Sequence, residues 1–361
     1  MLWRIEGHSL SAAFFKEKEM KLFKKSLALI TALSVSAVAL LSGCGSTSEI
    51  SSTEPSGTEA VTEAVTEATA APDYTGTISP LLYKAEGKNG NTMYLFGTIH
   101  VGDNRNDQIV NSLCDELQSC DALAVEFDSV EYEGNLEEQM ATMKTFLLTD
   151  GTTVKDHLRS DLYDKCVSYL TDAGNYNSMY DVYKPGFWDM LLSQTAVQQS
   201  DYSPDYGVDG MLTRKAYEFE KEVLSFESAQ FQVEMFAGFS DELVNLQIES
   251  FFETKDDYND DLKALYDAWT VGDEEKILEN LEGEGIDSSD EELTPEQEKL
   301  VEDYQKTMTY DRNKKMGEKA VSYLESGKNV FVAVGTAHII GDTGIVEYLK
   351  DKGYKVEKAA I

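Results

Sequence analysis

Apolar residues form strand-like runs and helically spaced sets at the start of the folded part of the chain. The runs 81–85 and 92–96 flank a Gly/Asn cluster and predict a β-hairpin. Over 106–119 the apolar residues recur at helical spacing and predict a helix. The run 122–127 predicts a buried strand that leads into acidic residues.

The C-terminal end repeats this arrangement. A strand is predicted over 329–334, a helix over 343–352 and a second strand over 354–357. Both ends of the chain therefore form strand–turn–helix–strand units, which are typical of a parallel sheet covered by helices. We predict an α/β fold with a central, mostly parallel sheet built from these two halves.

A large helical insertion is predicted between the halves, over about 133–326. The exception is 222–227, which follows a predicted helix over 209–220 and indicates a further core strand ending in a glutamate. The acid-rich pieces 256–261 and 282–292 are interpreted as solvated loops or helix faces.

The N-terminal segment has the pattern of a processing signal. Met20 is followed by basic residues, then by an apolar run over 27–41 and by Leu-Ser-Gly-Cys ending at Cys44. This tetrapeptide resembles a bacterial lipobox, so we predict a lipoprotein signal peptide over 20–43 and a lipid on Cys44. A transmembrane anchor is the alternative, although the apolar run is short for a span. Residues 1–19 are interpreted as sequence upstream of the native start.

Residues 44–73 consist mainly of Ser, Thr, Glu, Ala and Pro and predict a disordered acidic tether. A flexible chain of about 30 residues has an end-to-end distance on the order of 30 Å. We therefore expect the α/β domain, 74–361, to act outside the cytoplasm at a membrane surface to which Cys44 anchors it.

The net charge of the chain narrows the choice of partners. The formal net charge is −35, and it becomes −38 without residues 1–43, which hold six Lys/Arg and three Asp/Glu. Such a chain repels phosphate backbones, so we expect no nucleic-acid partner.

Cys114 and Cys120 lie about 9 Å apart along the predicted helix, too far for a disulfide. We interpret them and Cys166 as buried thiols.

Two copies of Gly-Thr-x-His follow two of the predicted strands, at Gly97–His100 and Gly335–His338. The chain has only four His, and two of them lie in these motifs. Because ligands bind beyond the carboxyl ends of strands in parallel sheets, we expect the two imidazoles to face one another there. The glycines are expected to permit a sharp turn and a close backbone approach.

Two glutamates, Glu126 and Glu227, follow two other predicted strands. Two imidazoles and one carboxylate are a common ligand set for Zn, Mn, Co or Fe, with positions left open for water. We predict a divalent metal (Mn, Co or Zn) on His100, Glu126 and His338, where it would lower the pKa of a bound water. Glu227 is the candidate proton shuttle.

Each candidate has a structural alternative. The paired histidines could be hydrogen-bonded core residues, and Glu126 could simply form a salt bridge to Arg312. Asp103, in the Gly-Asp pair after the first motif, is either a support for the metal ligands or a turn residue. His157 is interpreted as a surface or capping residue.

Five segments in order resemble the motifs of the TraB/GumN family, which includes the animal Tiki proteins, and the resemblance covers 80–358. The segments are Tyr94–Asp103, Asp121–Asp128, Gly207–Gly210 with Leu224–Glu227 and Gln232, Arg312–Asn313, and Val332–His338. The middle motif usually reads Leu-Glu-Thr, and here it is Phe226-Glu227-Ser228, which keeps the acid.

The resemblance implies an α/β core shared with erythromycin esterase-like and ChaN-like proteins. It also implies metal-dependent peptide hydrolysis, as in the Tiki branch, with His100, His338 and Glu126 as essential residues. Arg312 would bind an anion or organise the site. Some bacterial members are linked to the restraint of peptide pheromones.

The leading hypothesis is therefore a lipid-anchored, extracytoplasmic, metal-dependent hydrolase acting on a peptide or protein at the cell surface. Arg312 would stabilise the oxyanion or the substrate carboxylate. Tyr183 and Trp188 could line the substrate groove, with core packing as the alternative. The alternative function is a non-catalytic lipoprotein that sequesters a peptide or a haem-like ligand.

Overall fold

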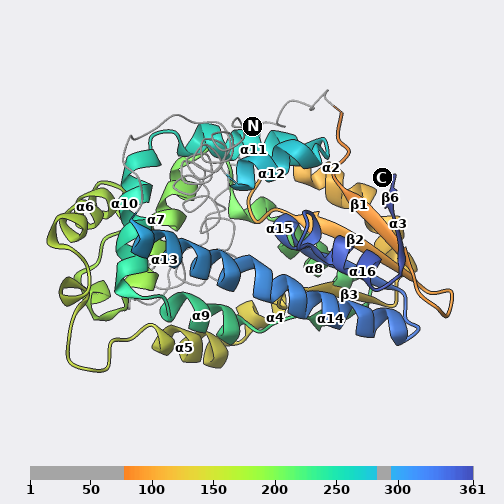
Figure 1. Ribbon diagram of the computed structural model, residues 1–361, viewed down its shortest axis with the longest axis horizontal. Helices are drawn as coiled ribbons and strands as arrows, with labels where there is room; N and C mark the ends of the chain where they lie inside the picture. Colours follow the sequence, from red (N-terminus) through yellow and green to blue (C-terminus); the bar gives the residue numbers. More distant parts are fainter. Residues whose placement is uncertain (1–76, 283–293, 361) are drawn as a thin grey trace, which may run out of the picture.

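The computed structural model describes residues 77–282 and 294–360 (Figure 1). The strands are β1 (Leu82–Glu86), β2 (Thr92–Thr98), β3 (Ala122–Val125), β4 (Glu222–Ser225), β5 (Val330–Gly335) and β6 (Lys355–Ala359). The signal peptide, Cys44, the tether and nearly all of the acid-rich segment 282–292 lie outside the described residues. Within the described ranges, no helix has the length and apolar character needed to cross a bilayer.

The α-helices are α2 (Arg105–Ser112), α3 (Cys114–Ser119), α4 (Ser129–Gly134), α5 (Leu136–Thr145), α6 (Ser160–Asp172), α7 (Pro185–Gln199), α8 (Val208–Glu218), α9 (Ala229–Ala237), α10 (Asp241–Thr254), α11 (Tyr258–Thr270), α12 (Glu274–Glu282), α13 (Pro295–Gln305), α14 (Asp311–Glu325), α15 (Thr336–Ile339) and α16 (Ile345–Asp351). The short 3-10 helices are η3 (Val154–Asp156), η4 (Ser178–Val182) and η5 (Pro204–Tyr206), and a π-helical segment, η6 (Lys306–Tyr310), joins α13 to α14.

The strands form one mixed sheet in the order β4-β3-β5-β2-β1-β6. Strands β4, β3, β5 and β2 are parallel to one another, whereas β1 is antiparallel to both β2 and β6. The predicted α/β fold is therefore confirmed, including the N-terminal hairpin. Strand β5, from the C-terminal half, lies between β2 and β3 of the N-terminal half.

The central strands are buried on both faces. All four residues of β3 and the first five of β5 are buried, which explains their continuous apolar runs. Helix α8 packs on β3, β4 and β5, while α16 packs against α14 and β6. The edge strands β4 and β6 keep exposed side chains. Figure 1 shows the sheet in the right half of the view and α6, α7 and α10 of the helical insertion in the left half.

The helical insertion is confirmed, with β4 as the one strand that its described residues contain. Trp188 is fully buried, and its ring contacts those of Tyr163 and Tyr176, so it is a core residue. Tyr183 stacks on Phe187 with ring centroids 4.5 Å apart. Neither Trp188 nor Tyr183 lines the two cavities described below, so core packing is the correct interpretation of both.

Two local predictions were wrong. The predicted helix over 106–119 is divided at Leu113 into α2 and α3. Cys114, Cys120 and Cys166 are free thiols, as expected, but only Cys120 and Cys166 are buried, and Cys114 is half-buried.

Asp189 is a buried acid in the middle of α7, with 5% exposure. Burial raises its pKa to about 7. A carboxyl group whose pKa is higher in the folded state destabilises the fold progressively as pH rises from about 4 to 7. We expect Asp189→Asn to stabilise the protein at pH 8 by up to about 4 kcal/mol, from about 1.4 kcal/mol per pKa unit, and to change stability little at pH 4.

Denaturant unfolding at both pH values measures this difference. Asp172→Asn is the matched control, because Asp172 is exposed on α6. Equal effects of Asp189→Asn at pH 4 and pH 8 would contradict the prediction.

Candidate active site

Four parallel strands deliver the candidate residues to one edge of the sheet. His100 follows β2, Glu126 follows β3, Glu227 follows β4 and His338 follows β5. His100, Glu126 and His338 line one cavity, together with Arg312. The expected meeting of the two motif histidines is therefore confirmed.

Gly335 marks the point at which these groups converge. A Cβ atom at Gly335 would lie 3.0 Å from Glu126 Oε1, 3.6 Å from His338 Cδ2 and 3.8 Å from His100 Nε2. His338 Nε2 itself lies 3.7 Å from Glu126 Oε1. Any larger residue at Gly335 would therefore fill the space between the two imidazoles and the carboxylate.

The motif glycines act by close approach and not by a sharp turn. Gly97 lies inside β2, and Gly335 has a φ of −47°, so neither adopts the left-handed conformation. A Cβ atom at Gly97 would come within 2.8 Å of Thr336 Oγ1 and 3.0 Å of its Cα. The expected turn was wrong for His338 as well, since it lies in the short helix α15.

Each imidazole is held through Nδ1 by a polar side chain from a helix. His100 Nδ1 lies 2.9 Å from Asp209 Oδ1 in α8, and a carboxylate can only accept, so Nδ1 carries a proton. His338 Nδ1 lies 2.5 Å from Asn313 Oδ1 in α14, while Asn313 Nδ2 donates to the Ala337 carbonyl. His338 is therefore the Nδ1–H tautomer, and its Nε2 carries the lone pair.

Arg312 spans the two glutamates. Its Nη2 donates to Glu126 Oε2 at 2.7 Å and to Glu227 Oε2 at 2.8 Å, and its Nε donates to Glu227 Oε1 at 2.9 Å. Gln232 Nε2 also donates to both acids. The salt bridge expected as the alternative role of Glu126 is thus present. Glu126 Oε1 accepts instead from the Gly335 N–H and lies near His338 Nε2, in the cavity that His100 also lines.

Glu227 does not reach the cavity. Both of its oxygens accept hydrogen bonds from Arg312, and it lines neither of the two cavities at this edge of the sheet. The structure therefore places Glu227 behind Arg312, where it orients the guanidinium.

Burial and the charge of Arg312 set the protonation of the site. Burial of Glu126 would raise its pKa, but Arg312, followed by the two imidazoles, lowers it well below its usual range. Burial, followed by Arg312, lowers the pKa of His338 to about 3, so this imidazole is neutral at pH 7. Burial would lower the pKa of His100, but Asp209 and Glu126 raise it above its usual value. The two imidazoles thus differ in their affinity for a proton.

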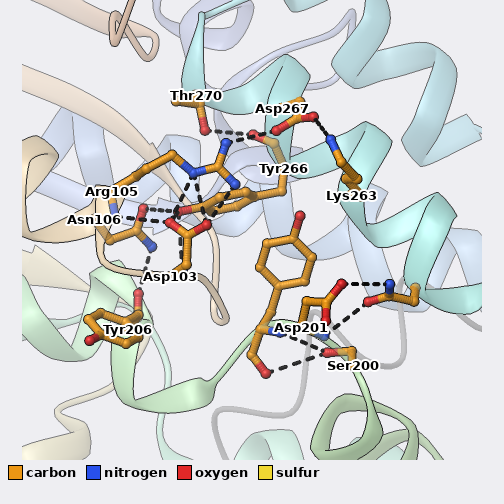
Figure 2. A network of polar contacts seen from close by, with 12 residues as sticks. Asp103, Arg105, Asn106, Ser200, Asp201, Tyr206, Lys263, Tyr266, Asp267 and Thr270 are labelled. Atoms are coloured by element: carbon orange, nitrogen blue, oxygen red, sulfur yellow. Dashed lines mark hydrogen bonds and ion pairs between the residues drawn. The ribbon is translucent and has the colours of Figure 1, made fainter. Parts of the chain in front are cut away.

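Asp103 belongs to a different network, shown in Figure 2. Arg105 Nε donates to both of its oxygens at 2.9 Å, and the Tyr266 hydroxyl donates to Oδ1 at 3.0 Å. Arg105 also pairs with Asp267 at 2.8 Å and stacks over the Tyr266 ring. Asp103 lines neither cavity, so the structure does not bring it to the metal-ligand candidates.

Two residues that contact the histidines were not predicted as site residues. Asp209 begins the predicted helix 209–220 within Gly-Val-Asp-Gly, and Asn313 directly follows Arg312. Their only sequence signal was membership of segments that resemble family motifs. Nothing in the spacing indicates that an acid 109 positions away holds His100.

The residues fit a divalent cation by donor chemistry. Imidazole Nε2 atoms and a carboxylate oxygen are suitable ligands for Mn, Co or Zn, and an imidazole whose Nδ1–H is held by an acceptor is the usual arrangement at metal centres. Over the described ranges, however, no group of three or more His, Cys, Asp or Glu side chains is arranged so that it could hold a metal ion. The fit therefore rests on the two oriented imidazoles and Glu126 Oε1.

The cavity beside these groups has an empty volume of about 610 Å³, including its open mouth. A second, smaller cavity of about 280 Å³ is lined by His100, Glu126 and Asp209, among others.

Fold and site together define an α/β protein in which two Gly-Thr-x-His histidines and two arginine-bridged glutamates meet at the carboxyl edge of a mostly parallel sheet. The model of the TraB/PrgY/gumN family matches residues 81–358, and the chain belongs to this family. No curated protein matches the chain.

Proposed function

We propose that the protein is an extracytoplasmic, metal-dependent hydrolase of peptide bonds, with the metal held by His100, Glu126 and His338. The observation that carries this proposal is the convergence of both imidazoles and Glu126 Oε1 on the space beside Gly335. A divalent cation there would lower the pKa of a bound water and make hydroxide available for attack on a carbonyl.

The surrounding residues hold these groups in place. Asp209 and Asn313 direct the Nε2 edges of the imidazoles through their Nδ1–H groups. The donors of Arg312 are used by Glu126, Glu227 and the Met308 carbonyl, which supports a site-organising role over oxyanion binding. We therefore assign Glu227 to the positioning of Arg312 and not to proton transfer.

A peptide library tests the proposal. The purified full-length chain, its bound metals quantified, is incubated with the library alone, with a chelator, and with added Mn, Co or Zn. We expect cleavage that the chelator removes and one of the metals restores. Stoichiometric metal without chelator-sensitive cleavage would overturn hydrolysis and favour the sequestering alternative.

Asp209→Asn tests the orientation of His100. The variant loses the carboxylate that fixes the Nδ1–H, and we expect a fall in kcat/KM of about 10- to 100-fold with little change in Tm. Asp205→Asn, an exposed change in η5, is the matched control. Equal activity of the two variants would contradict this role.

We also propose anchoring through a lipid on Cys44, as the lipobox-like sequence suggests. A Cys44→Ser chain should lose the lipid and move from the membrane fraction to the soluble fraction. Mass spectrometry of the N-terminal peptide measures the modification directly. Unchanged membrane association would contradict lipid anchoring at this residue.

A further inference from the structure

The cavity beside the candidate active site has two chemically different walls. One wall carries His100, Glu126, Arg312 and His338. Another part of the lining, called here the apolar wall, consists of five large nonpolar side chains from α11, α12 and η6: Leu265, Trp269, Ile277, Leu281 and Met308. None of these side chains carries a charge.

The apolar wall is attached directly to the strand that leads to His100. Trp269 Nε1 donates to the Gly97 carbonyl at 2.8 Å, within β2. The Tyr266 ring stacks on Trp269 with centroids 5.8 Å apart and an interplanar angle of 24°. The apolar wall therefore keeps a fixed position relative to the first Gly-Thr-x-His motif.

The Arg105 network in Figure 2 also holds α11. Arg105 lies 4.3 Å above the Tyr266 ring and pairs with Asp103, next to β2, and with Asp267 on α11. A cation between two acids and an aromatic face joins the two segments at several points. The network thus supports the apolar wall instead of the metal-ligand candidates.

A charged substrate side chain would find no partner on this wall. Burial of an unpaired charge against apolar side chains is costly, and the cation at the cavity, Arg312, is already bonded to Glu126 and Glu227. An aliphatic side chain gains free energy from the same contacts.

We propose that the apolar wall is a specificity subsite for an uncharged aliphatic side chain, of leucine or isoleucine size, on the residue next to the scissile bond. This inference rests on the proposed peptide hydrolysis and assigns Leu265, Ile277 and Met308 as specificity-determining residues.

Paired variants at Ile277 test the size of the subsite. Ile277 is fully buried on α12 and lines the cavity. We expect Ile277→Ala to raise, and Ile277→Phe to lower, the kcat/KM ratio of a phenylalanine peptide to a leucine peptide, each by about 10-fold. The two changes should act in opposite directions, which a general loss of stability would not produce.

Ile248→Ala is the matched control. Ile248 is equally buried, on α10, and lines neither cavity. It should lower Tm without moving the specificity ratio. If Ile277→Phe does not fold, Met308→Phe and Met308→Ala on η6 give the same comparison of a filled and an enlarged subsite.

A binding measurement separates the subsite from catalysis. N-acetyl-leucine amide and N-acetyl-aspartate amide are titrated into the full-length chain while tryptophan fluorescence is recorded. We expect the leucine amide alone to change the emission, with the change lost in Trp269→Phe and weakened in Ile277→Ala.

Four outcomes are distinguishable. Leucine-selective cleavage that shifts with Ile277 supports both proposals. Cleavage that prefers charged side chains, or ignores the Ile277 variants, overturns the subsite and leaves hydrolysis standing. No cleavage, with leucine amide binding that depends on Ile277, supports the subsite and counts against hydrolysis. The absence of both cleavage and binding would overturn the subsite and the proposed hydrolysis together.

Discussion

Replacement of both motif histidines by alanine is expected to lower kcat/KM for a cleaved peptide by about 10³-fold or more. His100 and His338 share one cavity, and each presents Nε2 at the space beside Gly335 or Glu126. Because they act as one unit, each single variant should cost nearly as much as the double variant. The bound metal should fall in parallel.

His157→Ala is the matched control for this result. His157 bonds to Asp241 and Thr152 and lies in neither cavity. This variant should keep its metal and its activity. A double variant at His100 and His338 that still cleaves peptides at the wild-type rate would remove the physical basis of the proposed site.

Replacement of Arg312 by methionine should have the largest effect on stability. Arg312 is 4% exposed, and its loss leaves two buried carboxylates, Glu126 and Glu227, without their shared cation. Breaking a buried ion pair in this way costs about 3–5 kcal/mol. We expect a clear fall in the free energy of unfolding at pH 7.5, measured in denaturant.

The effect of Arg312→Met should also depend on pH. In the wild type the pKa of Glu126 is lowered, so its stabilising contribution is present above the pKa of the unfolded chain and is lost only as pH falls through the folded value. Without Arg312, burial dominates and raises the pKa of Glu126, so ionisation opposes folding. The deficit of the variant should therefore grow from about pH 4 to pH 7.

Arg159→Met is the matched control. Arg159 also pairs with two acids, Asp161 and Glu249, but its side chain is 47% exposed. Solvent screening should limit its cost to about 1 kcal/mol or less. Similar losses of stability in the two arginine variants would contradict this role of the buried bridge. So would a deficit of Arg312→Met that is the same at pH 4 and pH 7.

Local sequence patterns were sufficient for most elements of the core. Continuous apolar runs predicted β2, β3 and β5 because parallel strands covered on both faces need no polar alternation. The order of the strands could not be predicted in this way. The position of β5 between β2 and β3 is set by long-range packing, which the local periodicity of apolar residues does not reveal.

The residues of the site that directly follow parallel strands could be predicted from the sequence. His100, Glu126 and His338 meet because parallel strands end at one edge, whereas Asp209 and Asn313 reach the imidazoles from helices whose packing is not encoded locally. Asp103 was misleading for the same reason. Asp103 pairs with Arg105 and lies beside α11, a helix more than 150 positions later in the sequence.

The central position of β5 has a consequence for biosynthesis. Until residue 335 has left the ribosome, β2 and β3 lack the strand that separates them, so the nascent chain cannot complete its sheet. Non-local strand pairing of this kind is slow to form. The sheet therefore stays open until β5 has been synthesised, and the two imidazoles come together only once β5 has joined β2 and β3.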